Sequence, residues 1–379
     1  MNDEQELRDR FEAITVPPSR LEVDALVAAG RRRTFLRRSG QAAGGVALAT
    51  GLLVAVPTMV IGRPGPPEPI TASPGPAGTV AKSCGGAALR VPAGVKGASA
   101  NGVDPTGRYI IGHYFQGQDF RPLLWTDGVP RKLPLEAPSM QLNSVNANGV
   151  AAGLAEGPNI EYAFRYENGK YTRLRTPPGK WHVYPYPMMN AAGDVVMNAE
   201  PQGKSGGADG IALLWEAGST TPITLPLPGN ANVYDITDDG LIVGGLFEDG
   251  GAHTPYVWDR TGRGRELKVA PGLTSAAYSA EGDWATGGLW PESGSGTPAL
   301  WNLRTGKFTE LPGQGPGDVV NSDGWVLAAH ELIRDNQKVT LVAPKDQNSA
   351  ALGLSDTGLV VGHTLDNDDT ILAPRSWQC

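Results

Sequence analysis

The chain has 379 residues, 51 of them glycine and 32 proline, with a formal net charge of −7 and a pI near 5.3. Glycine and proline stand well above their usual shares of roughly 7% and 5%, which excludes a helical bundle or coiled coil, and 40% hydrophobic residues exclude a mainly disordered chain. The net negative charge argues against the basic surface that nucleic-acid binders need, so we expect no nucleic-acid partner. The composition as a whole predicts a turn-rich, strand-rich globular protein.

Residues 1–38 contain two short amphipathic patterns. Leu7, Phe11 and Ile14 lie at i, i+4 and i+7, and a capping-box pattern from Ser19 to Glu22 opens a second helical segment. We predict a cytoplasmic helical tail. One interpretation is a tail that lies on the membrane; the other is a docking site for a cytoplasmic regulator in residues 1–37, which would make the protein a signal transducer resembling membrane anti-sigma factors.

Residues 39–62 carry no charge and lie between Arg38 and Arg63. As a helix they would measure about 36 Å, enough to cross a hydrocarbon core of ~30 Å. Several arginines precede them, so we predict a single transmembrane helix with a cytoplasmic N-terminus and everything beyond it outside the cell membrane. The alternative is a twin-arginine export signal, RRTFLR at 32–37, whose cleavage would release a secreted protein.

A Pro-rich linker, residues 63–83, leads to a repetitive segment, residues 84–379. Seven glycines recur at intervals of about 42 residues, the period of a propeller blade. Each follows a short side-chain acceptor by three positions, as expected for a tight turn in which glycine takes a positive φ. The pairs are Asp104 with Gly107, Asn146 with Gly149, Asn190 with Gly193, Thr237 with Gly240, Ser279 with Gly282, Asn321 with Gly324 and Ser355 with Gly358.

The first five repeats continue with an apolar run, a variable loop, an aromatic residue, a second turn glycine and a leucine. Repeat six has lost the loop and the aromatic residue but keeps Leu341, and repeat seven ends before its last strand. This order predicts four short antiparallel strands, a to d, in every repeat, and so an all-β, seven-bladed β-propeller over residues 84–379. Five of the nine tryptophans take the aromatic position in strand c, where packing between blades explains them: Trp125, Trp215, Trp258, Trp301 and Trp377.

The seventh repeat ends at Cys379 before its last strand. Residues 89–92, at the other end of the domain, match the missing strand d, and Cys84 precedes Leu89 by the usual distance from turn glycine to leucine. We therefore predict that the N-terminal segment completes the seventh blade and that a Cys84–Cys379 disulfide replaces the absent turn. The export predicted above favours such a bond between the two cysteines of the chain.

These repeats resemble the bacterial extracellular HAF-type repeat proteins, whose unit runs roughly IN-x-x-G-x-VVG followed by AF-x-W-x-x-G-x-x-x-x-L. Two stretches carry the resemblance, SVNANGVAAG with YAFRYENGKYTRL, and DITDDGLIVGG with TPYVWDRTGRGRELKVAP. The resemblance covers essentially all of residues 84–379. It implies propeller-like repeats on a surface protein and assigns no functional residue.

The sequence contains only partial matches to catalytic and metal-binding motifs. The G-x-S-x-G at 203–207 lies in a Gly-rich loop with no helix after it, so a nucleophile elbow is excluded. His113, His330 and His363 occupy similar positions in neighbouring repeats, and we interpret them as structural or solvent-exposed. The acidic run 366–369 has no calcium-loop spacing. We predict no catalytic constellation, no metal site and no cofactor, and therefore no enzyme.

The loops between strands b and c vary in length and hold the unusual side chains: Lys204, Asp249, His253, Trp290 and Glu292. Binding residues usually lie on loops carried by a rigid scaffold. We therefore predict an exported, membrane-anchored, non-enzymatic surface module whose b–c face binds or senses a surface protein or a cell-wall glycan. A secreted propeller enzyme with its site in the central channel is the alternative.

Overall fold

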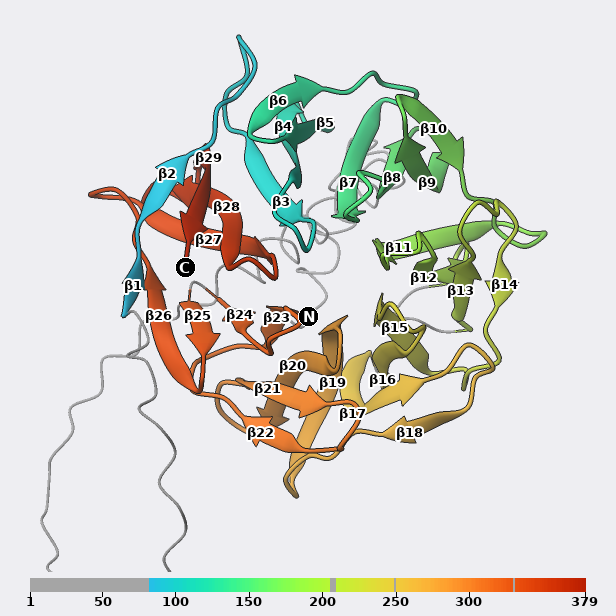
Figure 1. Cartoon of the computed structure of the whole chain (residues 1–379). Helices are drawn as coiled ribbons and strands as arrows, with labels where there is room; N and C mark the ends of the chain where they lie inside the picture. The colour runs from blue at the N-terminus through green and yellow to red at the C-terminus, as the bar shows by residue number, and fades with distance from the viewer. Residues whose placement is uncertain (1–81, 205–208, 249, 330) are drawn as a thin grey trace, which may run out of the picture. The chain divides into compact units, whose positions relative to one another are not determined.

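The computed structural model of the chain describes residues 82–204, 209–248, 250–329 and 331–379, and all regular elements in these ranges are β-strands. The strands form seven sheets, and the sheets follow one another around a common axis as blades (Figure 1). No helix in these ranges has the length and apolar character needed to cross a membrane. The predicted helical tail, the transmembrane segment 39–62 and nearly all of the linker lie outside the described residues.

Each blade contains four antiparallel strands, a to d, from the axis outwards. The a strands are β3 (Ser99–Val103), β7 (Ser139–Val145), β11 (Trp181–Met189), β15 (Ala231–Ile236), β19 (Leu273–Glu281), β23 (Gly317–Val320) and β27 (Asn348–Leu354). The b strands are β4 (Tyr109–Gln116), β8 (Ala151–Gly157), β12 (Val195–Pro201), β16 (Ile242–Glu248), β20 (Trp284–Pro291), β24 (Val326–Ala328) and β28 (Leu359–Leu365). The c strands are β5 (Asp119–Thr126), β9 (Ile160–Glu167), β13 (Ile211–Trp215), β17 (Gly251–Trp258), β21 (Thr297–Asn302), β25 (Glu331–Arg334) and β29 (Ile371–Gln378).

The outermost, d strands are shorter: β6 (Val129–Lys132), β10 (Lys170–Arg173), β14 (Ile223–Thr224), β18 (Gly264–Glu266), β22 (Phe308–Glu310), β26 (Gln337–Leu341) and, in blade seven, β2 (Gly86–Ala88). The predicted seven-bladed propeller of four-stranded blades is confirmed. One strand was not predicted: β1 (Ser83–Cys84) pairs in parallel with β26 and gives blade six a fifth strand.

The seam of the ring lies where the two ends of the propeller meet. β2 pairs with β29, so an N-terminal strand completes the last blade, and a disulfide joins Cys84 to Cys379. Both predictions are confirmed. The predicted strand, 89–92, begins three residues after the observed strand, Gly86–Ala88, because Leu89 is the residue that follows strand d. Its N–H donates to Pro374 O, as the Leu133 N–H donates to Pro122 O in blade one.

Tryptophans in strand c pack against the preceding blade and form hydrogen bonds with it. All five are at most 2% exposed. Four of their indole N–H groups donate to a backbone carbonyl of the preceding blade. The acceptor is in each case the residue after the leucine at the end of strand d: Trp125 to Arg90, Trp215 to Arg175, Trp301 to Lys268 and Trp377 to Val342. The core therefore lies between blades, and the interpretation of these residues as packing groups is confirmed.

Every predicted turn glycine between strands a and b has a positive φ, from 56° to 92°. Gly149 shows why substitution is costly there: its φ is 75°, and an added Cβ would lie 2.7 Å from Tyr109 Cζ of the preceding blade.

Gly149→Ala is therefore expected to destabilise the propeller by about 2 kcal/mol or more, from the left-handed backbone and the ring contact together. Gly128→Ala is the matched control, because Gly128 has a φ of 76° and no atom within 4 Å of an added Cβ. Chemical denaturation of both variants measures the difference. Equal losses at the two positions would show that the contact with Tyr109 contributes nothing.

Candidate functional site: an acidic cavity on the propeller axis

A β-bulge interrupts every innermost strand at an equivalent position. The register between strands a and b shifts once in each blade. In six blades the shift leaves one residue outside the ladder: Asn101, Asn143, Tyr234, Tyr278, Asp318 and Leu352. In blade three the shift spans three residues, 185–187. Bulges re-aim side chains, and all six residues are only half-buried although they lie on the innermost strands.

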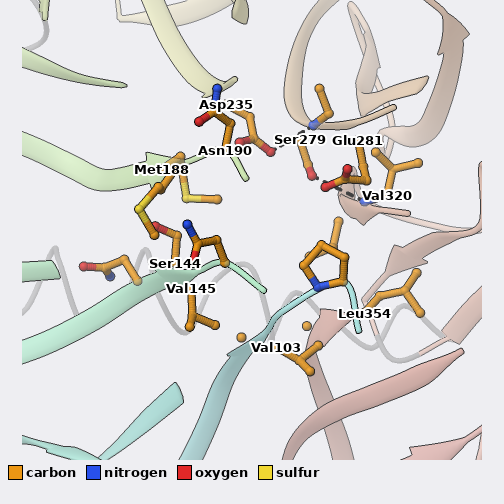
Figure 2. Close-up of a pocket in the computed structure, with 18 of the residues that line it drawn as sticks. Val103, Ser144, Val145, Met188, Asn190, Asp235, Ser279, Glu281, Val320 and Leu354 are labelled. Atoms are coloured by element: carbon orange, nitrogen blue, oxygen red, sulfur yellow. Dashed lines mark hydrogen bonds between the residues drawn. The ribbon is translucent and has the colours of Figure 1, made fainter. Parts of the chain in front are cut away.

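Five of the six bulge residues line one cavity of about 150 Å³ on the axis, which we call the axial cavity. It lies at the a–b turn end of the innermost strands, and all seven blades contribute to it. Five carboxyl groups line it: Asp235, Asp238, Glu281, Asp318 and Asp356. None of the lining residues in the described chain is Lys, Arg or His. Figure 2 shows Asp235, Ser279 and Glu281 together on one side, with Val103 and Val145 across from them.

Three of these carboxyl groups have raised pKa values. Burial raises the pKa of Glu281 to about 8, and the neighbouring charges of Asp238, Asp356 and Asp235 add to the effect. Burial also raises the pKa of Asp318 to about 7, although a backbone hydrogen bond from Ala329 opposes it. Strongly perturbed carboxyl groups in a cavity are typical of functional sites. This cavity therefore holds carboxyls that change protonation near neutral pH.

Asp235 differs from the other two because the protein backbone holds its carboxylate. Its Oδ1 accepts from Ile236 N at 2.9 Å and its Oδ2 from Ala280 N at 2.9 Å. Burial raises the pKa of Asp235 to about 6 against these hydrogen bonds. Asp235 thus joins strand β15 to the a–b turn of the next blade, beside Glu281.

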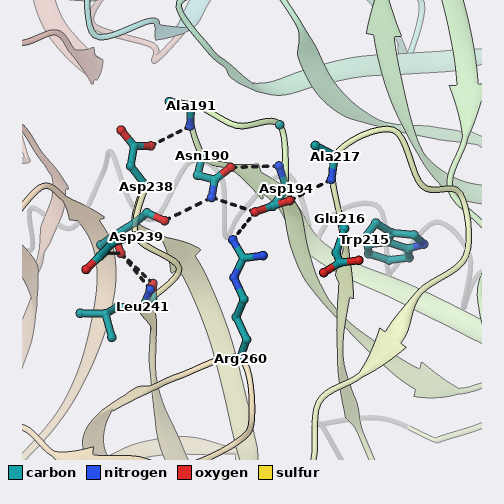
Figure 3. Close-up of polar contacts among 12 residues, drawn as sticks. Asn190, Ala191, Asp194, Trp215, Glu216, Ala217, Asp238, Asp239, Leu241 and Arg260 are labelled. Carbon is teal, nitrogen blue, oxygen red and sulfur yellow. Dashed lines mark hydrogen bonds and ion pairs between the residues drawn. The ribbon is translucent and has the colours of Figure 1, made fainter.

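The a–b turns around the cavity are linked by hydrogen bonds between blades (Figure 3). Asn190 donates to Thr237 O at 3.2 Å, and Asp238 Oδ1 accepts from Ala191 N at 2.7 Å. On the other side of the ring, Asp356 Oδ1 accepts from Ser322 N at 2.9 Å. Two of the cavity's acids therefore belong to a rigid ring of turns, which fixes where their carboxylates lie.

Arg260 and Asp194 anchor the turn of blade three in this ring. The Arg260 guanidinium contacts Asp194 Oδ2, and Asp194 Oδ1 accepts from Ala217 N at 2.8 Å (Figure 3). Burial opposes ionisation of Asp194, but these hydrogen bonds outweigh it, so its pKa is lowered. This carboxylate is a structural group, unlike those in the cavity.

The residues predicted to bind on the b–c loops lie elsewhere, and none of those described lines the axial cavity. Lys204 forms an exposed ion pair with Asp209 at 3.3 Å, and His253 lies 3.7 Å from Glu248. Trp290 is half-buried, with its ring centroid 5.9 Å from that of Tyr278, while Glu292 is exposed. Asp249 lies outside the described residues. The structure does not gather these groups into one site.

Two of the predicted structural histidines meet at the contact of blades seven and one. His363 Nδ1 lies 2.8 Å from Ser99 Oγ, and His113 Nδ1 lies 2.7 Å from Asn101 Nδ2. Burial and then the charge of His363 lower the pKa of His113 to about 3, so it stays neutral. Both histidines are less than 9% exposed and act as packing groups. His330 lies outside the described residues.

The acidic run at 366–369 forms a local turn, in which Asp366 Oδ1 accepts from Asp368 N and Thr370 N, each at 2.9 Å. Among the residues that the structure describes, no three His, Cys, Asp or Glu side chains are grouped so as to hold a metal ion. Of the G-x-S-x-G motif, residues 205–207 lie outside the described ranges.

The acids of the axial cavity were not predicted from the sequence. Glu281 stands directly before the turn glycine Gly282, a position that is also acidic in two other repeats, Asp239 and Asp323, so it does not stand out. Asp318 interrupts an otherwise apolar innermost strand, which is a visible departure. The sequence does not show that Glu281 and Asp318 face a common cavity.

No protein-family model and no curated protein matches this chain. Solved structures do match. An oligogalacturonate lyase from Vibrio parahaemolyticus has a TM-score of 0.55 at 10% identity, over 77% of this chain and 93% of that one. A structure of oligogalacturonate lyase in complex with manganese has a TM-score of 0.54 at 9% identity, over 79% and 98%. TolB from Acinetobacter baumannii has a TM-score of 0.42 at 10% identity, over 75% and 64%. At these identities the likeness shows the propeller fold alone.

The comparison contradicts the predicted function, a non-enzymatic, membrane-anchored surface binding or sensing module. The two reported structures with TM-scores above 0.5 carry the name of an enzyme. The prediction rested on the variable b–c loops and on the lack of a catalytic motif. A propeller assembles its axial residues from separate blades, so a site there leaves no motif in the sequence, and the lack of a motif did not exclude the alternative of a propeller enzyme.

Proposed function

We propose that the protein is a propeller enzyme that uses general acid–base catalysis in the axial cavity. The observation that carries this proposal is the pair of carboxyl groups, Glu281 and Asp318, that face one cavity from different blades with pKa values of about 8 and about 7. Both carboxyls titrate near neutral pH, so each can hold or release a proton there. A proton donor and a proton acceptor in one cavity are the usual arrangement for general acid–base catalysis.

The higher pKa of Glu281 favours it as the proton donor and Asp318 as the proton acceptor. Asp318 acts as the general base and takes a proton from an attacking water. Glu281 acts as the general acid and gives its proton to the leaving oxygen, so that hydrolysis of a C–O bond balances without a further reactant. Asp235, whose oxygens accept backbone N–H groups, keeps Ala280 and hence Glu281 in place.

The lining limits the charge of the substrate. The described lining residues include five carboxyls and no basic side chain, so the cavity would repel a polyanion such as an oligogalacturonate. The substrate proposed here therefore differs from the oligogalacturonate in the names of the two matched lyases. A cavity of about 150 Å³ accepts a small molecule or one unit of a longer one. We therefore propose a neutral or cationic substrate.

We further propose that the propeller is exported. The Cys84–Cys379 bond supports this, because disulfides persist in oxidising compartments outside the cytoplasm. Anchoring through residues 39–62, or cleavage after a twin-arginine signal, remains a prediction for the N-terminal segment.

Turnover of p-nitrophenyl esters and of neutral and amino-sugar p-nitrophenyl glycosides tests the catalytic proposal. Asp318→Asn and Glu281→Gln are each expected to lower kcat by about 10²- to 10⁴-fold. The wild-type rate should rise as Asp318 ionises near pH 7 and fall as Glu281 loses its proton near pH 8.

Glu292→Gln, on a b–c loop outside the cavity, is the matched control and should retain the wild-type rate. Asp318→Asn should also remove the rise on the acidic side of the pH profile. Rates within two-fold of the wild type in both cavity variants would contradict the proposal, as would no turnover anywhere in the panel.

A further inference from the structure

The sequence contains three Asn-Gly pairs, at 101–102, 148–149 and 168–169. In such a pair the backbone nitrogen of glycine can attack the side-chain amide of asparagine, because glycine has no side chain that blocks the approach. The structure places the first pair in an innermost strand, the second in the a–b turn of blade two and the third in the c–d turn of the same blade. These surroundings decide which pair can react.

The fold holds two of the pairs in place. Asn101 is half-buried, and its Nδ2 lies 2.7 Å from His113 Nδ1. In the a–b turn the Gly149 N–H donates to Asn146 O at 2.9 Å, so the nitrogen that would attack Asn148 already takes part in the turn. Ring closure at either pair would break these contacts, and the folded chain therefore opposes it.

The third pair has no such restraint. Asn168 and Gly169 are exposed in a two-residue turn, with φ values of 50° and 84°. The Gly169 N–H makes no hydrogen bond within the described chain, and no atom beyond its chain neighbours lies within 4 Å of an added Cβ at this glycine. The space beside the backbone is therefore free for a five-membered ring, and attack by Gly169 costs that residue no hydrogen bond.

We propose that Asn168 is a site of spontaneous deamidation in the folded chain, with water as the only co-reactant. The Gly169 nitrogen gives its proton to solvent and bonds to Asn168 Cγ, and the side-chain nitrogen takes a proton and leaves as ammonia. Water then opens the resulting succinimide at one of its two carbonyl carbons. Opening at Cγ gives aspartate, and opening at the backbone carbonyl gives isoaspartate, in which the main chain runs through Cβ and Cγ.

The two products affect the hairpin differently. Aspartate suits this turn, because the equivalent turn of blade one has Asp127 and Gly128 with φ values of 51° and 76°. Isoaspartate adds a methylene to the main chain of a two-residue loop, and the length of such a loop fixes the register of its strands. Tyr171 in β10 would then lose its place opposite Tyr166 in β9. Only isoaspartate is therefore expected to weaken the outer strand of blade two.

Ageing of the full, folded chain at pH 8.5 and 37 °C tests the proposal. Trypsin cleavage after Arg165 and Lys170 releases the pair in peptide 166–170, and mass spectrometry detects the exchange of NH₂ for OH. Asn168 is expected to convert about ten-fold faster than Asn148, because reaction at Asn148 first requires the loss of a backbone hydrogen bond. The rate should rise with pH, since the attacking nitrogen has to lose its proton.

Asn168→Gly is the matched control, because glycine also adopts the positive φ of this turn and has no amide to lose. Its peptide 166–170 should stay unchanged on ageing, and its melting temperature should match that of the wild type. Aged wild-type protein enriched in isoaspartate should melt about 2–4 °C lower. Freshly purified Asn168→Asp should not, because it carries the charge without the longer main chain.

Ageing in denaturant separates structure from sequence. All three pairs are expected to convert at similar rates there, so that the order found in the folded chain reports the fold. No conversion at Asn168 in the folded chain, or equal conversion at Asn168 and Asn148, would overturn the proposal. Asn168 and Gly169 do not line the axial cavity, so the result is independent of the proposed enzyme.

Discussion

Replacing Cys84 by serine is expected to lower the stability of the propeller by up to about 5–6 kcal/mol, the value that the chain-entropy model gives for a loop of this length. The bond spans 295 residues and joins β1, the added strand of blade six, to the residue that follows the c strand of blade seven. Cys84 stands two residues before β2, the strand that completes blade seven. Without it, β1 and β2 remain attached only by short ladders of two and three residue pairs. The ring would then open at this seam first.

Thermal melting and guanidinium denaturation of Cys84→Ser measure this loss, and wild-type protein treated with a reducing agent should reproduce it. At roughly 2–4 °C for each kcal/mol, the melting temperature should fall by about 10 °C or more. Ser83→Ala is the matched control, because Ser83 is an exposed neighbour on the same strand. A melting temperature within 2 °C of the wild type would show that the seam holds without the bond.

The second large effect is expected at Arg165 in the c strand of blade two. Its side chain is buried, and its guanidinium donates four hydrogen bonds to backbone carbonyls of blade three. The acceptors are Gly193 O at 3.1 Å, Ser219 O at 2.7 Å, Trp215 O at 3.0 Å and Glu216 O at 2.7 Å. Burial lowers the pKa of Arg165, while the charges of Asp194 and Glu167 oppose that change.

Arg165→Met keeps the apolar stem and removes the guanidinium, which leaves four carbonyls without their donor. We expect a loss of about 3–5 kcal/mol, comparable to breaking a buried charged network. Arg165→Lys should recover only part of it, because an ammonium cannot match the planar fork. Arg263→Met is the control, since that side chain is 84% exposed and should shift the melting temperature little. Losses of equal size at 165 and 263 would contradict this account.

Much of the fold was predictable because each repeat encodes its own turns. The acceptor and glycine three residues later form a local hydrogen-bonded turn, so their period gives the number of blades without any long-range information. The tryptophan in strand c and the leucine after strand d recur for the same reason, as the contacts of Trp215 and Leu174 with neighbouring strands show. The Cys84–Cys379 pairing was also predictable, since an incomplete last repeat requires its missing strand from the other terminus.

The axial cavity was not predictable by that reasoning. Asp318 and Glu281 are separated by one repeat, and the charges that act on Glu281 include Asp238, one repeat before it, and Asp356, two repeats after it. Their position in one cavity depends on the closure of the ring and, for Asp318, on the bulge in its innermost strand, since Asp318 is one of five bulge residues that line the cavity. A bulge is a register shift between paired strands, and sequence periodicity does not reveal it.

The period and the turns of the repeats were therefore enough to predict the blades, and the incomplete last repeat was enough to predict the closure of the ring and the covalent bond at its seam. The place of the candidate site becomes visible only in the folded ring. It lies at the a–b end of the axis and not on the variable b–c loops, and burial there raises the pKa values of Asp318 and Glu281. Desolvation and proximity arise only when the seven blades pack around one axis, and no single repeat contains either.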